Sequence, residues 1–279
     1  MKVSIIIPTY NEAEVLPNCL ESLGMQSFTD FEIIVVDDGS SDFTSQMLRS
    51  AEKTLPNFNF FEQEHKGAGA ARNLGAKHAK GTILVFVDAD MTFDKDFLMK
   101  LVKPIQEGMT KGTFSKDENV SNWNNVWARC WNINEGWEDE KRHPKNYPDI
   151  QPVFRAILKD EFDKVGGFTP GGYDDDWSLS RKLGYQAINA PGAVFYHKNP
   201  ESLKEIYNHA KWVGKRKYKL GIVGDVVGLI RASFPISLVL GLIYAICYSL
   251  FAYLIFKIIY DFGIFVGITE FLVSGKSSK

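Results

Sequence analysis

The sequence is poor in cysteine and has no pronounced excess of either charge. Its three cysteines, Cys19, Cys130 and Cys247, are far apart and show neither metal-ligand spacing nor the even number typical of a disulfide framework. This usage favours a protein of a reducing compartment. The formal net charge is −2 at pH 7 and the pI is about 6.2. Without a basic excess, the composition argues against a nucleic acid as partner.

The N-terminus also lacks a secretory signal. MKVSIIIPTYNEAE contains only a short apolar run, broken by Ser4 and followed by Pro8 and acidic residues, whereas a signal peptide needs a longer apolar centre. No internal repeat or low-complexity linker is visible along the 279 residues. With 45% hydrophobic residues, the chain is long enough for one sizeable core and an appendage.

One long uncharged run stands out near the C-terminal end. Residues 234–256 read FPISLVLGLIYAICYSLFAYLIF, and about 20 apolar residues suffice to cross a bilayer. We therefore expect a membrane-associated segment over 221–279, with one span at about 234–256 and a tail that lies on the membrane surface. A second crossing and a buried core helix are the alternatives. Basic residues before the run favour a cytoplasmic location for the N-terminal part; they are Lys211, Lys215, Arg216, Lys217, Lys219 and Arg231.

Strand and helix patterns alternate over residues 1–107. Apolar runs at 2–8, 31–38, 57–62 and 82–90 predict strands, and periodic stretches at 9–23, 41–53 and 69–80 predict helices. We expect Asn11 to cap the first helix. Because the strands are almost continuously apolar, the pattern predicts an α/β fold with a parallel sheet covered on both faces. Ligands of such sheets bind outside the carboxyl ends of the strands.

Residues 108–150 differ in composition and predict an irregular, partly helical cap. Beyond them we expect a strand at 151–158, an acidic turn at 174–176 that folds back onto the first sheet, two short strands and a basic helix. Four tryptophans of the cap recur at spacings typical of one helix face, which favours core packing over stacking against a sugar or lipid; they are Trp123, Trp127, Trp131 and Trp137.

Acidic pairs follow two of the predicted strands. Asp88 and Asp90 end the most apolar strand, where like charges a few ångströms apart repel by several kcal/mol at an effective dielectric constant of about 20. A divalent cation would remove that repulsion, and carboxylate oxygens together with water and phosphate suit Mg²⁺ or Mn²⁺. A hydrogen-bonded turn is the alternative. Asp94 and Asp96 instead look like solvated acids at the start of a helix.

The second pair, Asp37 and Asp38, lies in DDGSSD. One interpretation is a turn with a helix cap, and the other is a carboxylate that accepts the imino proton of a nucleotide base. The later run GAGAARN lacks the third glycine of a dinucleotide loop in register and does not follow the first strand, so we reject that motif. Arg72, early in the next helix, could still reach a diphosphate.

Four motifs in this order and spacing resemble family 2 of the inverting glycosyltransferases. They are IIIPTYNEAEVLPNCLESL, VVDDGSSD, GAGAARNLGAKHAKGTILVFVDAD and GGYDDDWSLSRKLG, and together they extend over residues 1–200. The resemblance implies the A-type glycosyltransferase fold, in which a nucleotide-binding, Rossmann-like mixed sheet is flanked by helices. It divides the expected catalytic domain, 1–220, into a nucleotide-sugar-binding half, 1–107, and an acceptor half, 108–220.

The resemblance also implies roles for single residues. It assigns Asp88 and Asp90 to a metal ion on the donor diphosphate, and His197 to the same metal shell, although a lone histidine more often packs or hydrogen-bonds. The nucleotide pocket would be lined by Pro8, Tyr10, Glu12 and Asp38.

The expected catalytic base lies in Asp175-Asp176-Trp177. We expect Asp176 to act as the base. The family more often has Glu at position 175 and a further Asp where Ser178 stands, so Asp175 remains the alternative. Arg181 and Lys182, farther along the same motif, face either phosphate or solvent.

The resemblance implies transfer of a hexosyl or N-acetylhexosaminyl group from a nucleoside-diphosphate sugar, with inversion at the anomeric carbon. The apolar C-terminal segment makes a lipid-linked or cell-envelope acceptor plausible. A polyprenyl phosphate would be an ionised nucleophile and would need no base. A sugar-nucleotide pyrophosphorylase would have a Gly- and Arg-rich loop where this chain has PTYNEAE, and a catalytically inactive binding protein would lack the acidic residues.

Overall fold

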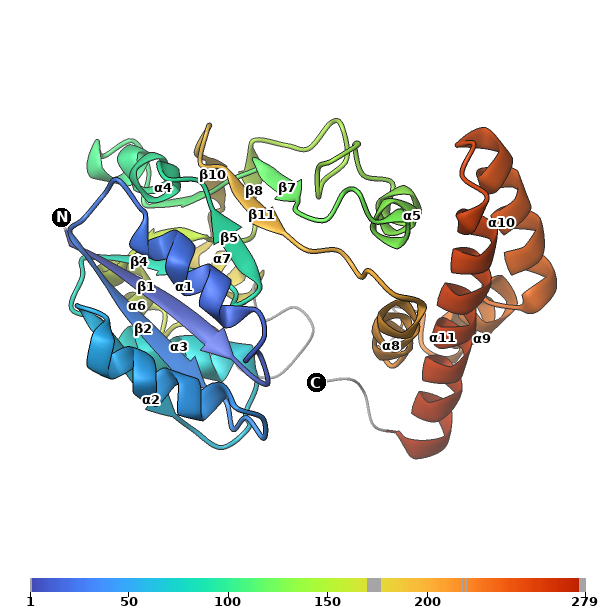
Figure 1. Cartoon of the computed structure of the whole chain (residues 1–279), viewed down its shortest axis with the longest axis horizontal. Helices are drawn as coiled ribbons and strands as arrows, with labels where there is room; N and C mark the ends of the chain where they lie inside the picture. Colours follow the sequence, from blue (N-terminus) through green and yellow to red (C-terminus); the bar gives the residue numbers. More distant parts are fainter. Residues whose placement is uncertain (1, 170–176, 217, 219, 276–279) are drawn as a thin grey trace. The chain divides into compact units, whose positions relative to one another are not determined.

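The computed structural model describes residues 2–169, 177–216, 218 and 220–275 (Figure 1). The chain divides into two compact units. The first consists of Met1–Asn119 and Asn146–His197, and the second of Val120–Lys145 and Lys198–Lys279. Each unit is described below by itself.

The first unit is built on a mixed sheet, with the strand order β3-β2-β1-β4-β9-β6-β10-β8 among the described residues. Four neighbouring strands are parallel: β3 (Phe58–Glu62), β2 (Phe31–Asp37), β1 (Val3–Thr9) and β4 (Ile83–Phe86). β9 (Ala156–Leu158) runs antiparallel to β4 and to β6 (Gly112–Phe114). β10 (Ala187–Asn189) is parallel to β6, and β8 (Ile150–Gln151) is antiparallel to β10. The mixed α/β sheet implied by the resemblance is confirmed.

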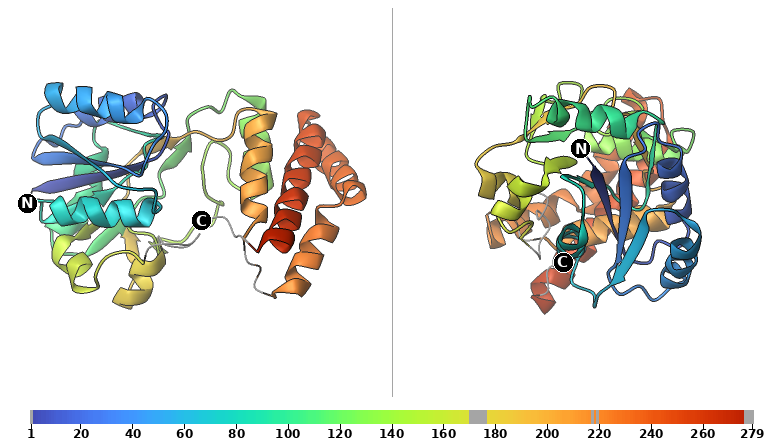
Figure 2. Two further views of the ribbon diagram at one scale, coloured as in Figure 1. Left: turned by 90° about the horizontal axis from the view of Figure 1, so that it is seen from below. Right: turned by 90° about the vertical axis from the view of Figure 1, so that its left-hand side faces the viewer.

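Both faces of this sheet are buried because successive strand residues point to opposite sides. Ile5 and Ile7 of β1 join a core with the helices of one face, and Ile6 joins a core with the helices of the other. The first face packs against α1 (Leu16–Gly24), α2 (Thr44–Thr54) and α4 (Phe97–Gln106). The second packs against α3 (Ala68–His78), α6 (Lys159–Lys164) and α7 (Ser178–Leu183) (Figure 2).

A small sheet of β5 (Met91–Phe93), β11 (Phe195–His197) and β7 (Glu118–Val120) adjoins the end of β4. β5 and β11 are antiparallel, and His197 pairs with Met91. This register places a residue from late in the chain directly beside Asp90. The late strand thereby contributes to the edge of the sheet where β4 ends.

The first helix begins later than the sequence pattern indicates. α1 starts at Leu16, with a proline in its first turn, and Asn11 has a φ of +58° in the preceding loop. The prediction that Asn11 caps this helix is wrong. Its side-chain oxygen accepts hydrogen bonds from the backbone N–H groups of Ser41 and Asp42, because the loop after β1 is tied to the loop after β2.

The second unit is helical. It contains α5 (Val126–Glu135), α8 (Leu203–Gly214), α9 (Ile222–Arg231), α10 (Phe234–Cys247) and α11 (Ala252–Ser274). Within this unit, α11 lies between α5 and α8 on one side and α9 and α10 on the other (Figure 1). Trp131 of α5 is buried against Phe256 and Tyr260 of α11, so its predicted role in core packing is confirmed.

The single helix expected over 234–256 is divided in the structure. α10 ends at Cys247 and α11 begins at Ala252. Ser249 has a φ of +51°, and the N–H of Leu250 bonds to the carbonyl of Ala245, a pattern that ends helices. The turn brings Tyr244 onto Tyr253, with ring centroids 5.3 Å apart. This stacking gives a physical reason for a break without glycine or proline.

The candidate membrane span is correspondingly displaced along the chain. In the part of the chain that the structure describes, Ala252–Ser274 is the one helix long and apolar enough to cross a membrane by itself. α9 and α10 satisfy the same criterion only as a pair, and they are bent by 56° at their junction.

Candidate active site

The candidate site lies where the strand order reverses. β2 and β3 follow β1 to one side of the sheet, whereas β4 pairs with its other side. In open α/β sheets, ligands bind at the carboxyl ends of the strands beside such a switch point. The ends of β1, β2 and β4 carry Tyr10, Asp38 and Asp88, respectively, so the fold brings together the acidic motifs that the sequence analysis selected.

Asp88 is neutralised by two arginines. One carboxylate oxygen accepts from Arg72 Nη2 of α3 at 2.8 Å, and the other accepts from Arg155 Nη1 at 3.3 Å. Arg155 is held there because its carbonyl accepts the N–H of Phe86 in β4 at 2.8 Å. Burial alone would raise the pKa of Asp88, but Arg72, Arg155 and His197 outweigh it and hold this pKa well below its usual range.

Asp90 has a different environment. Its Oδ2 lies 2.8 Å from His197 Nε2, and His197 Nδ1 lies 3.0 Å from Glu118 Oε1. The three side chains form a line, with His197 only 16% exposed and Asp90 36% exposed. A neutral imidazole carries one N–H, and here both ring nitrogens face carboxylates. One of these two contacts therefore needs a second proton or a cation.

This line of side chains fits a divalent cation. Histidines that bind metals commonly donate their other ring N–H to a carboxylate, which fixes the ring orientation, and Glu118 is placed for that role. Among the described residues no group of three metal-ligating side chains converges. Asp90 and His197 alone would leave most coordination positions to water and phosphate, as is usual for Mg²⁺. Asp88 has both carboxylate oxygens engaged by arginines.

The residues expected around the nucleotide are also close together in the fold. Pro8 is buried in β1, and Tyr10 is 44% exposed with its ring 4.2 Å from that of His65. The carboxylate of Asp38 is buried and accepts from Gln63 Nε2 at 2.6 Å and from the N–H groups of Lys66 and Gly67 at 2.8 Å each. Asp38 thus fastens the loop before α3. Asp37 makes the expected turn, accepting from Ser40 N and from Ser45 Oγ.

Glu12 is half-buried close to the same acidic group. Burial, together with the charges of Asp90, Asp42 and Asp88, raises the pKa of Glu12 to about 7. Its backbone N–H donates to Thr44 Oγ1 at 3.0 Å, which holds this part of the loop. The site therefore gathers more negative charge than its own arginines neutralise, and this favours a cationic ligand.

The expected base lies outside the described residues, which omit 170–176, so Asp175 and Asp176 have no structural account. The helix that follows them, α7, is described. Its Lys182 donates to the backbone carbonyl of Gly167 at 2.6 Å. One of the two basic residues of this motif is thus hydrogen-bonded to the protein's own backbone.

Two residues of the site were not identified from the sequence. Arg155 interrupts the apolar run QPVFRAIL, and a lone charge inside a predicted strand is a signal that could have identified it. Glu118 has no comparable signal, because it lies in a polar stretch and meets His197 only through the pairing of β5, β11 and β7.

The fold and the site define an open α/β protein with a candidate metal site at the switch point of its sheet. The family model "Glycosyl transferase family 2" matches residues 4–166, and the chain belongs to this family. It is 35% identical over 181 residues to the uncharacterized glycosyltransferase YfnE of Bacillus subtilis, covering 63% of this chain and 44% of YfnE. It is 26% identical over 232 residues to chondroitin synthase of Escherichia coli, covering 79% of this chain and 33% of the synthase.

Solved structures support the same fold. S. aureus TarS 1–349 in complex with UDP-GlcNAc matches with a TM-score of 0.58 and 18% identity, covering 100% of this chain and 93% of that one. The mannosyltransferase PcManGT from Pyrobaculum calidifontis, in complex with GDP-Man and Mn²⁺, matches with a TM-score of 0.58 and 21% identity, covering 94% and 87%. The chain spans less than half the length of YfnE and of chondroitin synthase.

Proposed function

We propose that this protein transfers a hexosyl or N-acetylhexosaminyl group from a nucleoside-diphosphate sugar to a lipid-linked or cell-envelope acceptor, with inversion and with a divalent cation. The observation that carries this proposal is the line Asp90–His197–Glu118 beside the arginine-bound Asp88, at the switch point of a family 2 sheet. The nucleotide sugars and the Mn²⁺ named with the TarS and PcManGT structures support the donor class and the cation.

In this proposal, Asp90 and His197 hold Mg²⁺ or Mn²⁺, and the cation supplies charge neutralisation for the departing nucleoside diphosphate. Glu118 orients the imidazole through Nδ1. Asp88 keeps Arg72 and Arg155 at the same edge of the sheet. A guanidinium group held there can bind phosphate oxygens in a bidentate manner.

The donor base is proposed to lie against the exposed ring of Tyr10 beside Pro8, at the end of β1. The carboxylate of Asp38 already accepts three hydrogen bonds. A nucleotide base that donates to Asp38 would therefore have to share its oxygens with these three donors. The other contribution of Asp38 is to shape the loop around the nucleotide.

Asp176, with Asp175 as the alternative, is proposed to take the proton of an acceptor hydroxyl while the oxygen attacks the anomeric carbon. A single displacement then inverts the configuration. With a polyprenyl phosphate as acceptor the nucleophile is already ionised, and this base is dispensable. The basic residues before the apolar helices suit the anionic lipids of the cytoplasmic leaflet, and this supports a cytoplasmic catalytic unit at a membrane.

The test is a transfer and donor-hydrolysis assay with UDP-, GDP- and dTDP-sugars, with and without Mn²⁺. Asp90→Asn removes a charge from the proposed cation site, and we expect it to lower metal-dependent turnover about 100-fold or more. Asp163→Asn, an exposed aspartate on α6, is the matched control and should retain activity. Equal metal-dependent turnover in both variants would refute the assigned site.

The same assay separates the transferase from a catalytically inactive binding protein. Donor binding with no turnover in the unaltered protein, for every sugar and acceptor supplied, would favour the binding protein. Asp176→Asn should keep donor binding and lose transfer to hydroxyl acceptors. Its full activity on such acceptors would contradict the assignment of the base.

A further inference from the structure

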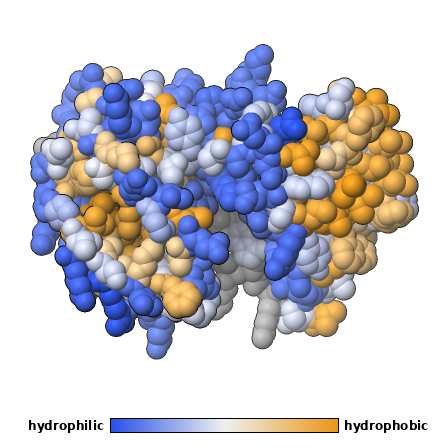
Figure 3. All heavy atoms as spheres, in the orientation of Figure 1, coloured by the Kyte–Doolittle hydropathy of each residue, from blue (hydrophilic) through white to orange (hydrophobic). Residues whose placement is uncertain are grey.

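The second unit exposes an extended apolar face. Along α9, the side chains of Val223, Val226, Val227 and Ile230 are between 43% and 63% exposed, and on α10 Leu242 and Ile246 are 51% and 64% exposed. Figure 3 shows orange, hydrophobic atoms gathered over α10 and α11. An apolar surface of this extent marks an interaction site rather than a surface left in water.

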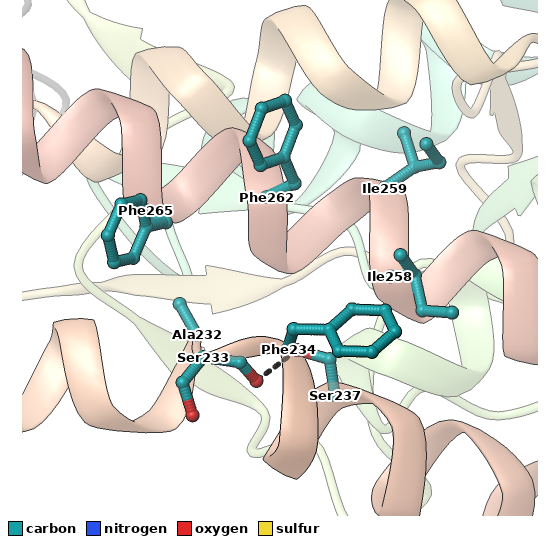
Figure 4. A pocket seen from close by; sticks show the side chains of 8 residues that line it. All are labelled: Ala232, Ser233, Phe234, Ser237, Ile258, Ile259, Phe262 and Phe265. Atoms are coloured by element: carbon teal, nitrogen blue, oxygen red, sulfur yellow. Dashed lines mark hydrogen bonds between the residues drawn. The ribbon is translucent and has the colours of Figure 1, made fainter.

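A groove opens between α11 and the junction of α9 and α10. Its volume is about 370 Å³, and its walls include Phe234 of α10 and Ile258, Phe262 and Phe265 of α11 (Figure 4). Ser237, which lines the same groove, has its hydroxyl oxygen 2.7 Å from Asp261 Oδ2 and 2.9 Å from the carbonyl oxygen of Ser233. Its single O–H can donate to either acceptor, so the hydroxyl is already engaged. Apart from this hydroxyl and Ser233 the lining is apolar, which suits hydrocarbon better than water.

The opposite side of α11 is covered by α5 and α8, which are less apolar than α9 and α10. Trp131 of α5 packs on its first half. On its second half, a Cβ added at Gly263 would lie 2.7 Å from the carbonyl oxygen of Tyr207, so α8 touches the helix backbone. Lys211 of α8 and Lys215, which follows the helix directly, bind the carboxylate of Glu270 at 2.5 and 2.6 Å. α11 is thus held along most of its length by α5 and α8.

The outer face of α8 is mostly polar: Lys204, Glu205, Asn208 and His209 are exposed, and Trp212 is the one large apolar side chain exposed along this described helix. If α11 crossed a bilayer in this arrangement, these side chains would enter the hydrocarbon beside it. Charged groups at that depth are strongly unfavourable. A bundle that is apolar on one side and polar on the other instead suits a position in one leaflet, parallel to the surface.

Two arginines also favour a position of the bundle in one leaflet. Arg216, which precedes α9 in the chain, and Arg231, its last residue, are exposed, and both can meet anionic headgroups while the helix lies in the interface. We propose that the face formed by α9, α10 and the groove docks into one leaflet of a lipid bilayer, so that α11 does not cross and the chain is monotopic. This proposal does not depend on the transferase activity.

The first experiment is flotation of the purified full chain with phosphatidylcholine vesicles that contain phosphatidylglycerol. Val223→Glu combined with Val227→Glu places two charges on the docking face, and we expect vesicle binding to fall about tenfold or more. Lys204→Glu on α8 changes the net charge by the same amount, and its binding should stay within about twofold of the original. Absence of binding by the unaltered chain, or equal binding by the double variant, overturns the proposal.

The second experiment determines the topology with an impermeant maleimide and sealed membranes, in a Cys247→Ser background. Single cysteines replace Ser50 of the first unit, Ser249 between α10 and α11, and Ser274 at the end of α11. We expect Ser274→Cys to react from the same side as Ser50→Cys, and Ser249→Cys to react from that side or to be protected. Ser274→Cys that reacts from the opposite side, or is protected, overturns the proposal, as does Ser249→Cys that reacts from the opposite side.

Discussion

Asp88 and Asp90 are one residue apart and yet have different electrostatic partners. Asp88 faces two guanidinium groups, whereas Asp90 faces an imidazole that is held by Glu118. The repulsion expected between them from the sequence is therefore relieved at Asp88 by the protein itself. The need for a cation is concentrated at Asp90, which is more exposed than His197.

Asp88 should make the free energy of unfolding depend on pH in the acidic range. Its pKa is lowered in the folded state, so it contributes stability above its unfolded pKa, and this contribution is lost as the pH falls below about 4. We expect Asp88→Asn to lower the free energy of unfolding by about 1–3 kcal/mol at pH 7, with a smaller difference near pH 3. Denaturant unfolding at both pH values measures this, and a difference that grows in acid would contradict it.

Glu12 should affect the pH dependence of stability in the opposite direction from Asp88. Its pKa is raised to about 7, so in the metal-free protein its contribution is fully present below the unfolded pKa and is lost as the pH rises through 7. We expect Glu12→Gln to be more stable than the original at pH 8 by about 1 kcal/mol, after allowance for solvent screening, and equal to it near pH 4. Unfolding in the presence of a chelator checks this prediction, and Glu14→Gln is the neighbouring control.

At the scale of elements, hydrophobic periodicity predicted the strands and the helices between them well. β1 and β2 lie where the apolar runs indicated because each is buried on both faces, and β3, which is only partly buried, also lies where its apolar run indicated. The start of α1 was missed because Asn11 hydrogen-bonds to a loop 30 residues away, which no local pattern contains. The end of α10 was missed for a similar reason, since Ser249 adopts its left-handed conformation in a turn that packs two helices together.

The close contact between α8 and α11 predicts that α11 does not tolerate a side chain at Gly267. Gly267 lies where a Cβ would be 3.0 Å from the Cα of Gly214 and would meet the carbonyl of Lys211. We expect Gly267→Ala to destabilise the second unit by about 1–3 kcal/mol, because overpacking forces the backbones apart. Gly24→Ala in α1, where no atom lies within 4 Å, should be neutral or stabilising. Thermal unfolding and limited proteolysis measure both, and an equal effect of the two variants would contradict the close packing.

At the scale of the whole molecule, the candidate site and the apolar helices belong to different compact units. The sequence indicated a catalytic part and a membrane part, but it assigned α5 and α8 to the former. The structure groups them with the apolar helices, since Trp131 and Gly214 pack on α11. The contact between His197 and Glu118 could not be predicted from the sequence either, because Glu118 reaches His197 only through a long-range strand pairing.

The two units should respond differently to a donor. Five of the six tryptophans lie in the second unit, so tryptophan fluorescence reports mainly on its unfolding. A nucleotide sugar with Mn²⁺ at 100 times its dissociation constant should stabilise the first unit by about 2.7 kcal/mol. Far-ultraviolet dichroism reports both units, so we expect the part of its transition that belongs to the first unit to move to higher temperature while the fluorescence transition stays. An equal shift of both would contradict independent units.

Gly263 and Gly267 also bear on self-association within membranes. Their spacing is the small-xxx-small pattern through which helices of separate chains often pair in lipid. In this protein Ala210, Lys211 and Gly214 of α8 already occupy that stripe. Two copies could use it only after α8 had been released from α11, so any dimer that keeps this fold must form through a different surface.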